Sequence, residues 1–161
     1  MAELYPVQAD VLICCGEPQA LDALPHSPHT ADRVAPDELL LLGNDLNADE
    51  VVQQLMTRDP NCLVLDVSDG YALWAIEGAG HKAAFGRLSA VPLPDAPAIV
   101  HGLVAQVPAT AIVKDTRIVI VVSSAVSAHL HGRIAGACAE LLEATYDEAR
   151  PLHETEGRVP A

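Results

Sequence analysis

Residues 63–78, Leu-Val-Leu-Asp-Val-Ser-Asp-Gly-Tyr-Ala-Leu-Trp-Ala-Ile-Glu-Gly, hold two alternating apolar runs on either side of a polar break. Within 63–67 and within 71–76, every second residue lies on the same face of an extended chain. The intervening Ser68-Asp69-Gly70 favours a turn, because serine and aspartate accept local hydrogen bonds and glycine tolerates positive φ. The stretch therefore predicts a β-hairpin that ends on glycine just before a helix.

Composition indicates a folded protein with a largely aliphatic core. Half of the 161 residues are apolar, but only one Trp, one Phe and three Tyr are aromatic. A chain of this length can bury a substantial core as one domain or as two small lobes. We therefore expect a core of Val, Leu, Ile and Ala side chains and no disorder on grounds of composition.

The charge balance is strongly acidic and argues against two classes of partner. There are 22 acidic residues and nine Lys or Arg, a formal net charge of −13. Such an excess of negative charge repels phosphate backbones and anionic membrane surfaces. We expect no nucleic-acid partner and no membrane association. The charge serves either solubility or docking onto a more basic protein.

Neither the N-terminus nor the cysteines indicate export. No apolar run approaches the roughly 20 residues that span a bilayer, and residues 1–6 lack the basic and apolar regions of a signal peptide. Cys14, Cys15, Cys62 and Cys138 form no C-x-x-C pair and have apolar neighbours. We expect reduced thiols packed as small apolar side chains, and a cytoplasmic protein.

Hydrophobic periodicity predicts further strands and helices. Strands are expected at 11–15, 39–42, 63–67, 71–76, 100–107, 109–113 and 117–122. Helices are expected after Asn47, where Glu50 completes a capping box, over 81–88, and after a cap at Ser123 or Ser124.

Prolines divide this series into segments. The predicted segments are an extended or loop-rich N-terminal segment (1–37), a first α+β lobe (38–93), a second α+β lobe (98–150) and a flexible tail (151–161). The N-terminal segment is assigned as loop-rich because residues 17–36 hold four prolines and no sustained periodicity. The proline-rich connector 89–97 is expected to join the lobes. The predicted fold class is α+β, with two small lobes of mostly antiparallel sheet and helices on one face.

The sequence predicts no catalytic residue. Ser123 and Ser124 precede a helix that carries His129 and His131, but no G-x-S-x-G nucleophile elbow surrounds them. Serines that cap helices are common. The cysteines lack the electropositive setting that activates a thiol. Hydrolysis at these residues is therefore not expected.

Metal and nucleotide sites are not predicted either. His26 and His29 lie in a proline-rich segment with no cysteine partners, and His81 follows a glycine at the start of a helix. Gly78 and Gly80 lack both the dinucleotide-binding spacing and a Walker lysine, which leaves a helix cap as the simpler interpretation. We expect no metal ligands, and the cofactor-binding residues stay unassigned.

An ordered series of short motifs carries a family resemblance. It consists of Asp66-Val-Ser-Asp-Gly-Tyr71, Leu73-Trp-Ala-Ile-Glu-Gly78, a helix ending near Leu88, and Val91-Pro-Leu93. In this order the chain resembles the gamma-subunit family of heterotetrameric sarcosine oxidase, part of the wider group of aminomethyltransferase and folate-binding domains. The resemblance covers residues 38–146.

The resemblance implies an aminomethyltransferase-like fold and an accessory role without catalytic residues. The chain would be a gamma-type subunit that stabilises a multi-subunit flavin-dependent amine oxidase or demethylase. The implied partners are larger flavoprotein subunits, and these would hold the FAD, FMN, NAD and tetrahydrofolate. Trp74 or Tyr71 could contact such a partner, although packing in the core is the simpler expectation for Trp74.

Two other functions stay open. One is a freestanding tetrahydrofolate-dependent aminomethyl or one-carbon transferase, or a folate-binding domain. The other is a small-molecule binding domain that belongs to no complex. A neighbouring gene for a large flavoprotein subunit would favour the accessory role, whereas saturable binding of tetrahydrofolate by the isolated chain would favour the transferase.

Overall fold

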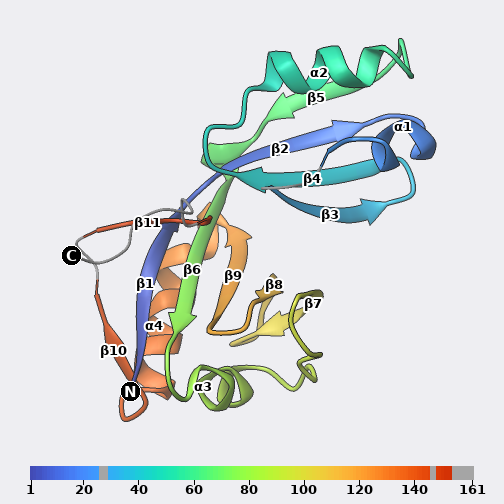
Figure 1. Cartoon of the computed structure of the whole chain (residues 1–161). Coiled ribbons are helices and arrows are strands. Elements are labelled where there is room, and N and C mark those ends of the chain that lie inside the picture. Colours follow the sequence, from blue (N-terminus) through green and yellow to red (C-terminus); the bar gives the residue numbers. More distant parts are fainter. Residues whose placement is uncertain (26–28, 146–147, 154–161) are drawn as a thin grey trace, which may run out of the picture. The chain divides into compact units, whose positions relative to one another are not determined.

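The computed structural model describes residues 1–25, 29–145 and 148–153, and these form two compact units (Figure 1). The first unit contains Met1–Gln8 and Asp69–Arg150, and the second contains Ala9–Ser68 with the described residues 151–153. Each unit has its own sheet, and the strands are mostly antiparallel. The fold is therefore α+β with two small lobes, and the predicted fold class is confirmed.

The first unit is built on a sheet with the strand order β10-β1-β6-β9-β8-β7, and β11 also pairs with β1. Its strands are β1 (Ala2–Gln8), β6 (Tyr71–Glu77), β7 (Ala98–Val104), β8 (Val107–Val113), β9 (Arg117–Ser123), β10 (Leu142–Ala144) and β11 (Arg150–Pro151). The pairings from β1 through to β7 are antiparallel, whereas β10 runs parallel to β1. The strand predicted at 117–122 is confirmed as the buried strand β9.

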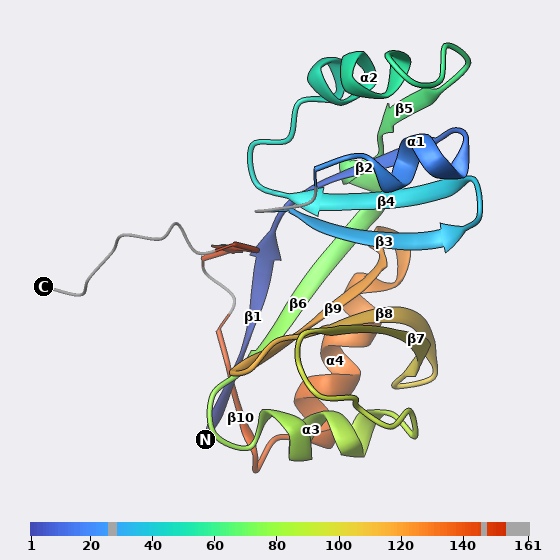
Figure 2. The same cartoon turned by 45° about the vertical axis from the view of Figure 1, so that its right-hand side comes forward.

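Two helices pack against the sheet of the first unit, α3 (His81–Leu88) and α4 (Ser127–Ala137), the latter preceded by a 3-10 turn at Ser124–Val126 (Figure 2). The helices contribute Phe85, Leu130 and Ile134, each at most 1% exposed, to a core shared with Ile118 and Ile120 of β9. The predicted helix at 81–88 is confirmed. An aliphatic core with a single phenylalanine follows from the composition.

The second unit has the strand order β3-β4-β2-β5. Its elements are β2 (Asp10–Cys15), α1 (Pro18–Asp22), β3 (Thr30–Ala35), β4 (Glu38–Gly43), α2 (Ala48–Met56) and β5 (Leu63–Asp66). The Asn47 side chain accepts hydrogen bonds from the backbone N–H groups of Asp49 and Glu50, which confirms the predicted cap of α2. Leu21 of α1 and Leu55 of α2 are fully buried in the core of this unit.

The hairpin predicted at 63–76 is wrong. β5 pairs with β2 in the second unit, whereas β6 lies between β1 and β9 in the first. Ser68–Gly70 forms a 3-10 turn, and the chain passes from one unit to the other after Ser68. β6 pairs with the seven-residue strands β1 and β9 along its two edges, and the four-residue β5 would satisfy fewer of its backbone groups than either.

The observed division of the chain differs from the predicted segments. Residues 1–37 contain β1, β2, α1 and β3 rather than an extended loop. Pro18 does not break α1 because it occupies the first helical turn, where its missing N–H has no partner to lose. The connector 89–97 lies inside the first unit, between α3 and β7, and does not join the two units.

The tail and one proline also differ from expectation. Leu152 is fully buried, and the backbone N–H of His153 donates to Asn44 of the same unit, so the start of the predicted tail is ordered; residues 154–161 lie outside the described part. Pro108 lies inside β8 instead of separating two strands. It is tolerated there because the pairing of β8 with β9 begins only at Thr110.

Candidate functional site

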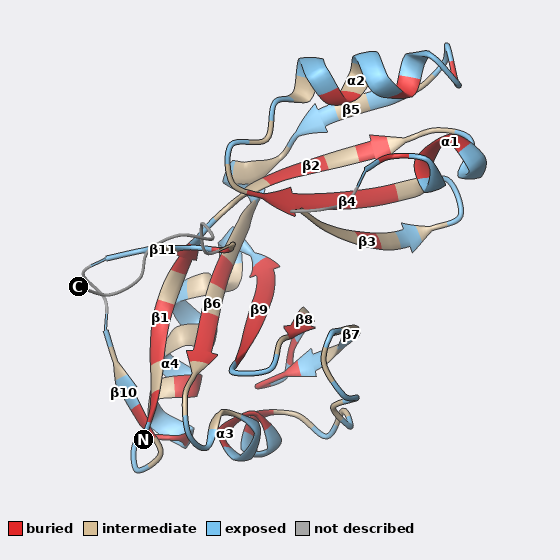
Figure 3. Ribbon diagram, in the orientation of Figure 1, coloured by how far each residue is buried: buried red, intermediate tan, exposed pale blue. Residues whose placement is uncertain are grey.

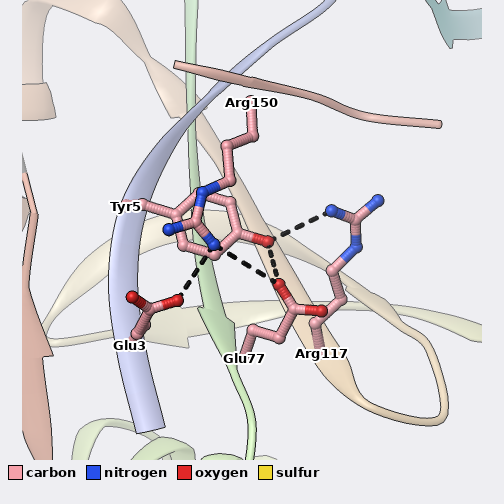
Figure 4. A network of polar contacts seen from close by, with 5 residues as sticks. All are labelled: Glu3, Tyr5, Glu77, Arg117 and Arg150. Carbon is pink, nitrogen blue, oxygen red and sulfur yellow. Dashed lines mark hydrogen bonds and ion pairs between the residues drawn. The ribbon is translucent and has the colours of Figure 1, made fainter. Parts of the chain in front are cut away.

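Five polar side chains gather on one face of the sheet in the first unit (Figure 4). Glu3 and Tyr5 come from β1, Glu77 from β6, Arg117 from β9 and Arg150 from β11. We call these five residues the Tyr5 cluster. The strand register places Glu3 opposite Glu77, and Glu77 opposite Arg117. Two carboxylates directly opposite each other repel, so this arrangement requires cations beside it.

The two arginines and the tyrosine supply those interactions. The Tyr5 hydroxyl donates to the Glu77 carboxylate and accepts from Arg117 Nη1 at 3.2 Å. Arg150 Nη1 lies 2.9 Å from Glu3 Oε2 and 4.0 Å from Glu77 Oε2. Its guanidinium carbon also lies 4.0 Å from the centroid of the Tyr5 ring, a cation–π contact. Tyr5 is fully buried and Arg117 is 5% exposed.

The pKa shifts in the Tyr5 cluster all favour the protonation states that hold it together. Burial, and then the hydrogen bond to Glu77, raise the pKa of Tyr5, so the phenol stays a neutral donor. The hydrogen bond from Arg150 lowers the pKa of Glu3, and that same bond raises the pKa of Arg150. None of these three shifts moves a pKa toward neutral pH, which is where the pKa of an acid–base catalyst is expected. The cluster therefore serves as a structural link between β1, β6, β9 and β11.

Trp74 packs inside the first unit. Its Nε1 donates to Ser127 Oγ at 3.0 Å, and its ring centroid lies 4.5 Å from that of His131. The indole is partly buried against the core of the unit, as expected for simple packing. Tyr71, at the start of β6, is half-buried.

Ser123 and Ser124 precede α4, and His129 and His131 lie on this helix. Ser123 and Ser124 are exposed and make no capping hydrogen bond, so the predicted serine cap is wrong; Val126 occupies the position before α4. His129 is exposed, whereas His131 contacts Trp74.

Burial lowers the pKa of His131. We therefore expect its imidazole to titrate below its ordinary midpoint of about 6.5. The unfolded chain then takes up a proton before the folded one as pH falls, so this residue lowers stability below about pH 6.5. NMR titration of the imidazole measures the midpoint directly. An H131Q variant should lose less stability than the wild type between about pH 7 and pH 5, and an equal loss in both would contradict the assignment.

All four cysteines are free thiols, as predicted. Burial raises the pKa of Cys14 to about 11, with neighbouring Cys15 and Cys62 adding to the shift. The pKa values of Cys15, Cys62 and Cys138 are also raised, in each case first by burial. A protonated thiol is a poor nucleophile and a poor metal ligand, so none of the four suits covalent catalysis.

Thiol labelling tests this description of the cysteines. In the folded chain at neutral pH, Cys14 and Cys138 should resist maleimide because both are buried. The partly exposed Cys15 and Cys62 should react slowly, and all four should react in urea. Peptide mapping by mass spectrometry after timed labelling separates the four sites. Rapid labelling of Cys14 in the folded chain would contradict the structure.

Gly78, Gly80 and His81 form the turn that precedes α3. Gly78 and Gly80 have positive φ values of 98° and 90°, which side-chain-bearing residues rarely adopt. His81 Nδ1 lies 2.9 Å from the carbonyl oxygen of Gly78, so the histidine closes the turn that begins the helix. Among the described residues, no group of three His, Cys, Asp or Glu side chains could hold a metal ion. His26 lies outside them, and His29 lines a small cavity of the second unit.

Two hollows of the second unit are lined by none of the residues of the Tyr5 cluster. The cavity beside His29 holds about 110 Å³ and includes Asp45, Asn47 and Glu50 among its lining residues. A second hollow of about 330 Å³ lies over α1 and α2, and Arg58 is the one charged residue that lines it. The first is smaller than the roughly 300 Å³ at which small-molecule sites begin. No helix in the described part of the chain is long and apolar enough to cross a bilayer.

The exposed apolar side chains of β5 form the surface that the sequence did not predict. Leu63 and Leu65 are 50% and 47% exposed on the same face of this strand, which is largely pale blue in Figure 3. Cys15 and Ile13 of β2 lie opposite them in the register and are partly exposed. We call Ile13, Cys15, Leu63 and Leu65 the β5 face. It could bind a protein, since exposed apolar patches often mark interaction sites.

Comparison with known proteins gives a structural similarity alone. No family model matches the chain, and no curated protein matches its sequence. A chain of heterotetrameric sarcosine oxidase from Corynebacterium sp. U-96 superimposes with a TM-score of 0.73 at 16% identity, covering 86% of this chain and 84% of that chain. The regulatory subunit of aspartate kinase from Thermus thermophilus superimposes with a TM-score of 0.48 at 11% identity, covering 85% of this chain and 97% of that chain. Aspartate kinase from Clostridium acetobutylicum superimposes with a TM-score of 0.47 at 12% identity, covering 85% of this chain and 34% of that chain. The TM-score of 0.73 extends over most of both chains, so this protein shares its fold with a chain of heterotetrameric sarcosine oxidase.

Proposed function

We propose that the chain is a non-catalytic, gamma-type subunit of a multi-subunit flavin-dependent amine oxidase or demethylase similar to sarcosine oxidase. Its role is to stabilise the complex. Its partners are the larger flavoprotein subunits, and these subunits hold the FAD, FMN, NAD and tetrahydrofolate. The compartment of the assembled complex is the cytoplasm.

The observation that carries this proposal is the fold shared with a chain of a heterotetrameric oxidase. The similarity extends over 86% of this chain and 84% of the other, so it is not limited to one common motif. The motif order from Asp66 to Leu93 gives independent support from the sequence.

The chemistry of the described side chains agrees with an accessory role. The Tyr5 cluster satisfies its own charges, and the thiols have raised pKa values. The β5 face offers exposed apolar surface instead. Surface of this kind suits a subunit whose function is to bind another chain.

The experiment is to purify the tagged chain from its native cells under mild conditions. Mass spectrometry identifies the co-purified subunits, and the visible spectrum reports flavin. We expect large flavoprotein chains in fixed proportion to this one, and flavin reduction when an N-methyl amine is added. In cells that lack this chain, the amount of assembled flavoprotein should fall, because a stabilising subunit is missing.

A colourless chain recovered alone would overturn the proposal. Titration of that chain with tetrahydrofolate would then test the alternative of a freestanding one-carbon transferase or folate-binding domain. Saturable binding at a ratio of one would support that alternative. The purification decides between the two functions because the first requires partners and the second does not.

A further inference from the structure

β5 is an outer strand of the sheet in the second unit. Within the described residues its paired neighbour is β2, so its other backbone edge has no strand beside it. An outer strand of this kind offers N–H and C=O groups to which an extended peptide can add. Many proteins prevent such pairing with lysine or proline on the strand, but Leu63–Asp66 contains neither.

The side chains of β5 are divided between the core and solvent. Val64 packs against the core formed with α1 and α2. Leu63 and Leu65, on the opposite face, each leave about half of their surface exposed. Leu40 and Leu42 of β4 lie on the same side of the sheet but are buried, at 7% and 1% exposed. The accessible apolar surface is therefore concentrated at the β5 edge.

The charge of the second unit indicates what kind of chain can bind there. Residues 9–68 contain 11 acidic residues and two arginines, a formal net charge of −9 with histidine neutral. Glu38 lies beside Cys15 in the strand register, and Cys15 in turn lies beside Leu63. The carboxylates of Glu38 and Asp37 both raise the pKa of Cys15, after burial, which places two negative charges next to the β5 face. A second copy of this unit would be repelled, whereas a basic segment would be attracted.

We propose that the β5 face binds an extended, basic segment of a partner protein, which adds as a further strand along β5. Apolar side chains at alternate positions of that segment cover Leu63 and Leu65. Lysine or arginine residues of that segment are attracted by the negative charge of the second unit, to which Glu38 and Asp37 contribute. The identification of the partner as a larger flavoprotein subunit rests on the proposed function, but the binding mode rests on β5 alone.

The first test is hydrogen–deuterium exchange on the full chain, alone and in the complex purified from native cells. Strand addition gives the backbone groups of residues 63–66 new hydrogen bonds, so their amides should exchange more slowly in the complex. The β7 edge in the first unit, Ala98–Val104, serves as an internal reference and should not change. Unchanged exchange at residues 63–66 in a complex that is otherwise intact would overturn the proposal.

The second test compares three double variants of the tagged chain. L63K/L65K places positive charges on the β5 face and should reduce the captured partner at least about tenfold. M56K/L103K makes the same change of charge at two other exposed apolar positions and should capture as much as the wild type. D37N/E38Q should weaken capture about threefold at low salt and reduce its salt dependence. Circular dichroism of each variant checks that the sheet is folded.

The outcomes separate this inference from the proposed function. A flavoprotein captured equally by wild type and L63K/L65K leaves the proposed function standing and overturns the β5 face as the docking site. A colourless partner lost in L63K/L65K, with slowed exchange at residues 63–66, supports the docking site and overturns the flavoprotein assignment. A wild-type chain recovered alone, or as a homodimer through β5, overturns both.

Discussion

Phe85→Ala is expected to lower the free energy of unfolding of the first unit by about 3–5 kcal/mol. Phe85 is the single phenylalanine of the chain, is 1% exposed, and lies on α3 in the core shared with β9 and α4. Its neighbours there are aliphatic side chains in regular strands and helices, which cannot move far enough to fill the space. Because whole domains are stable by only about 5–15 kcal/mol, a loss of this size leaves the first unit marginal.

The chain contains its own reporter for this measurement. Trp74 is the only tryptophan and belongs to the first unit, so its fluorescence in a urea titration follows that unit specifically. Leu103→Ala is the matched control, because Leu103 lies on β7 of the same unit but is 56% exposed. We expect the control to change stability by no more than about 0.5 kcal/mol. Equal urea midpoints for F85A and L103A would contradict the position of Phe85 in the core.

The elements predicted correctly are those whose signals are local. The run of β-branched residues in β9, the cap at Asn47 and the periodic segment of α3 each specify their own secondary structure. These signals act within one or two turns, or within one strand, and do not depend on the rest of the fold. The fold class follows from their order along the chain.

The pairing of the strands could not be predicted in the same way. The 63–76 stretch has the pattern of a hairpin, but β6 is a central strand and takes β1 as one neighbour, about 70 residues away in sequence. Proximity along the chain favours local pairing, whereas the burial of Leu73, Ala75 and Ile76 on the two faces of β6 favours longer and more apolar partners. The N-terminal prolines concealed β1 and β3, since a proline lowers the strand signal even where the ladder tolerates it.

The candidate sites depended on this long-range pairing. The Tyr5 cluster joins residues from positions 3 to 150, and no local spacing connects them. Alternation in 63–67 predicts that Leu63 and Leu65 share one face of a strand, but it does not indicate which strand is outermost, so their exposure could not be predicted. Trp74 was predicted correctly as a packed side chain, since a large aromatic residue in an apolar run is usually buried.

Tyr5→Phe is expected to destabilise the first unit by about 2–3 kcal/mol at neutral pH. The substitution keeps the buried ring beneath Arg150 but removes the hydroxyl that donates to Glu77 and accepts from Arg117. Both partners are charged, and Arg117 is almost fully buried, so the loss exceeds that of an ordinary exposed hydrogen bond. Trp74 fluorescence in urea measures the change, and Tyr71→Phe, at the half-exposed start of β6, provides the control. A Y5F variant as stable as Y71F would contradict the role of the hydroxyl.

The pH dependence of the same variant distinguishes the hydrogen bond from simple packing. The pKa of Tyr5 is raised in the folded state, first by burial and then by the Glu77 hydrogen bond. Above about pH 10 the unfolded chain therefore releases this proton before the folded chain does, and stability falls as pH rises through the folded-state pKa. The buried thiols also lower stability at alkaline pH, but this contribution is the same in wild type and Y5F. The difference in stability between the two proteins should consequently shrink above about pH 10. A difference that stays constant to higher pH would mean that the hydroxyl contributes through its shape and not through its proton.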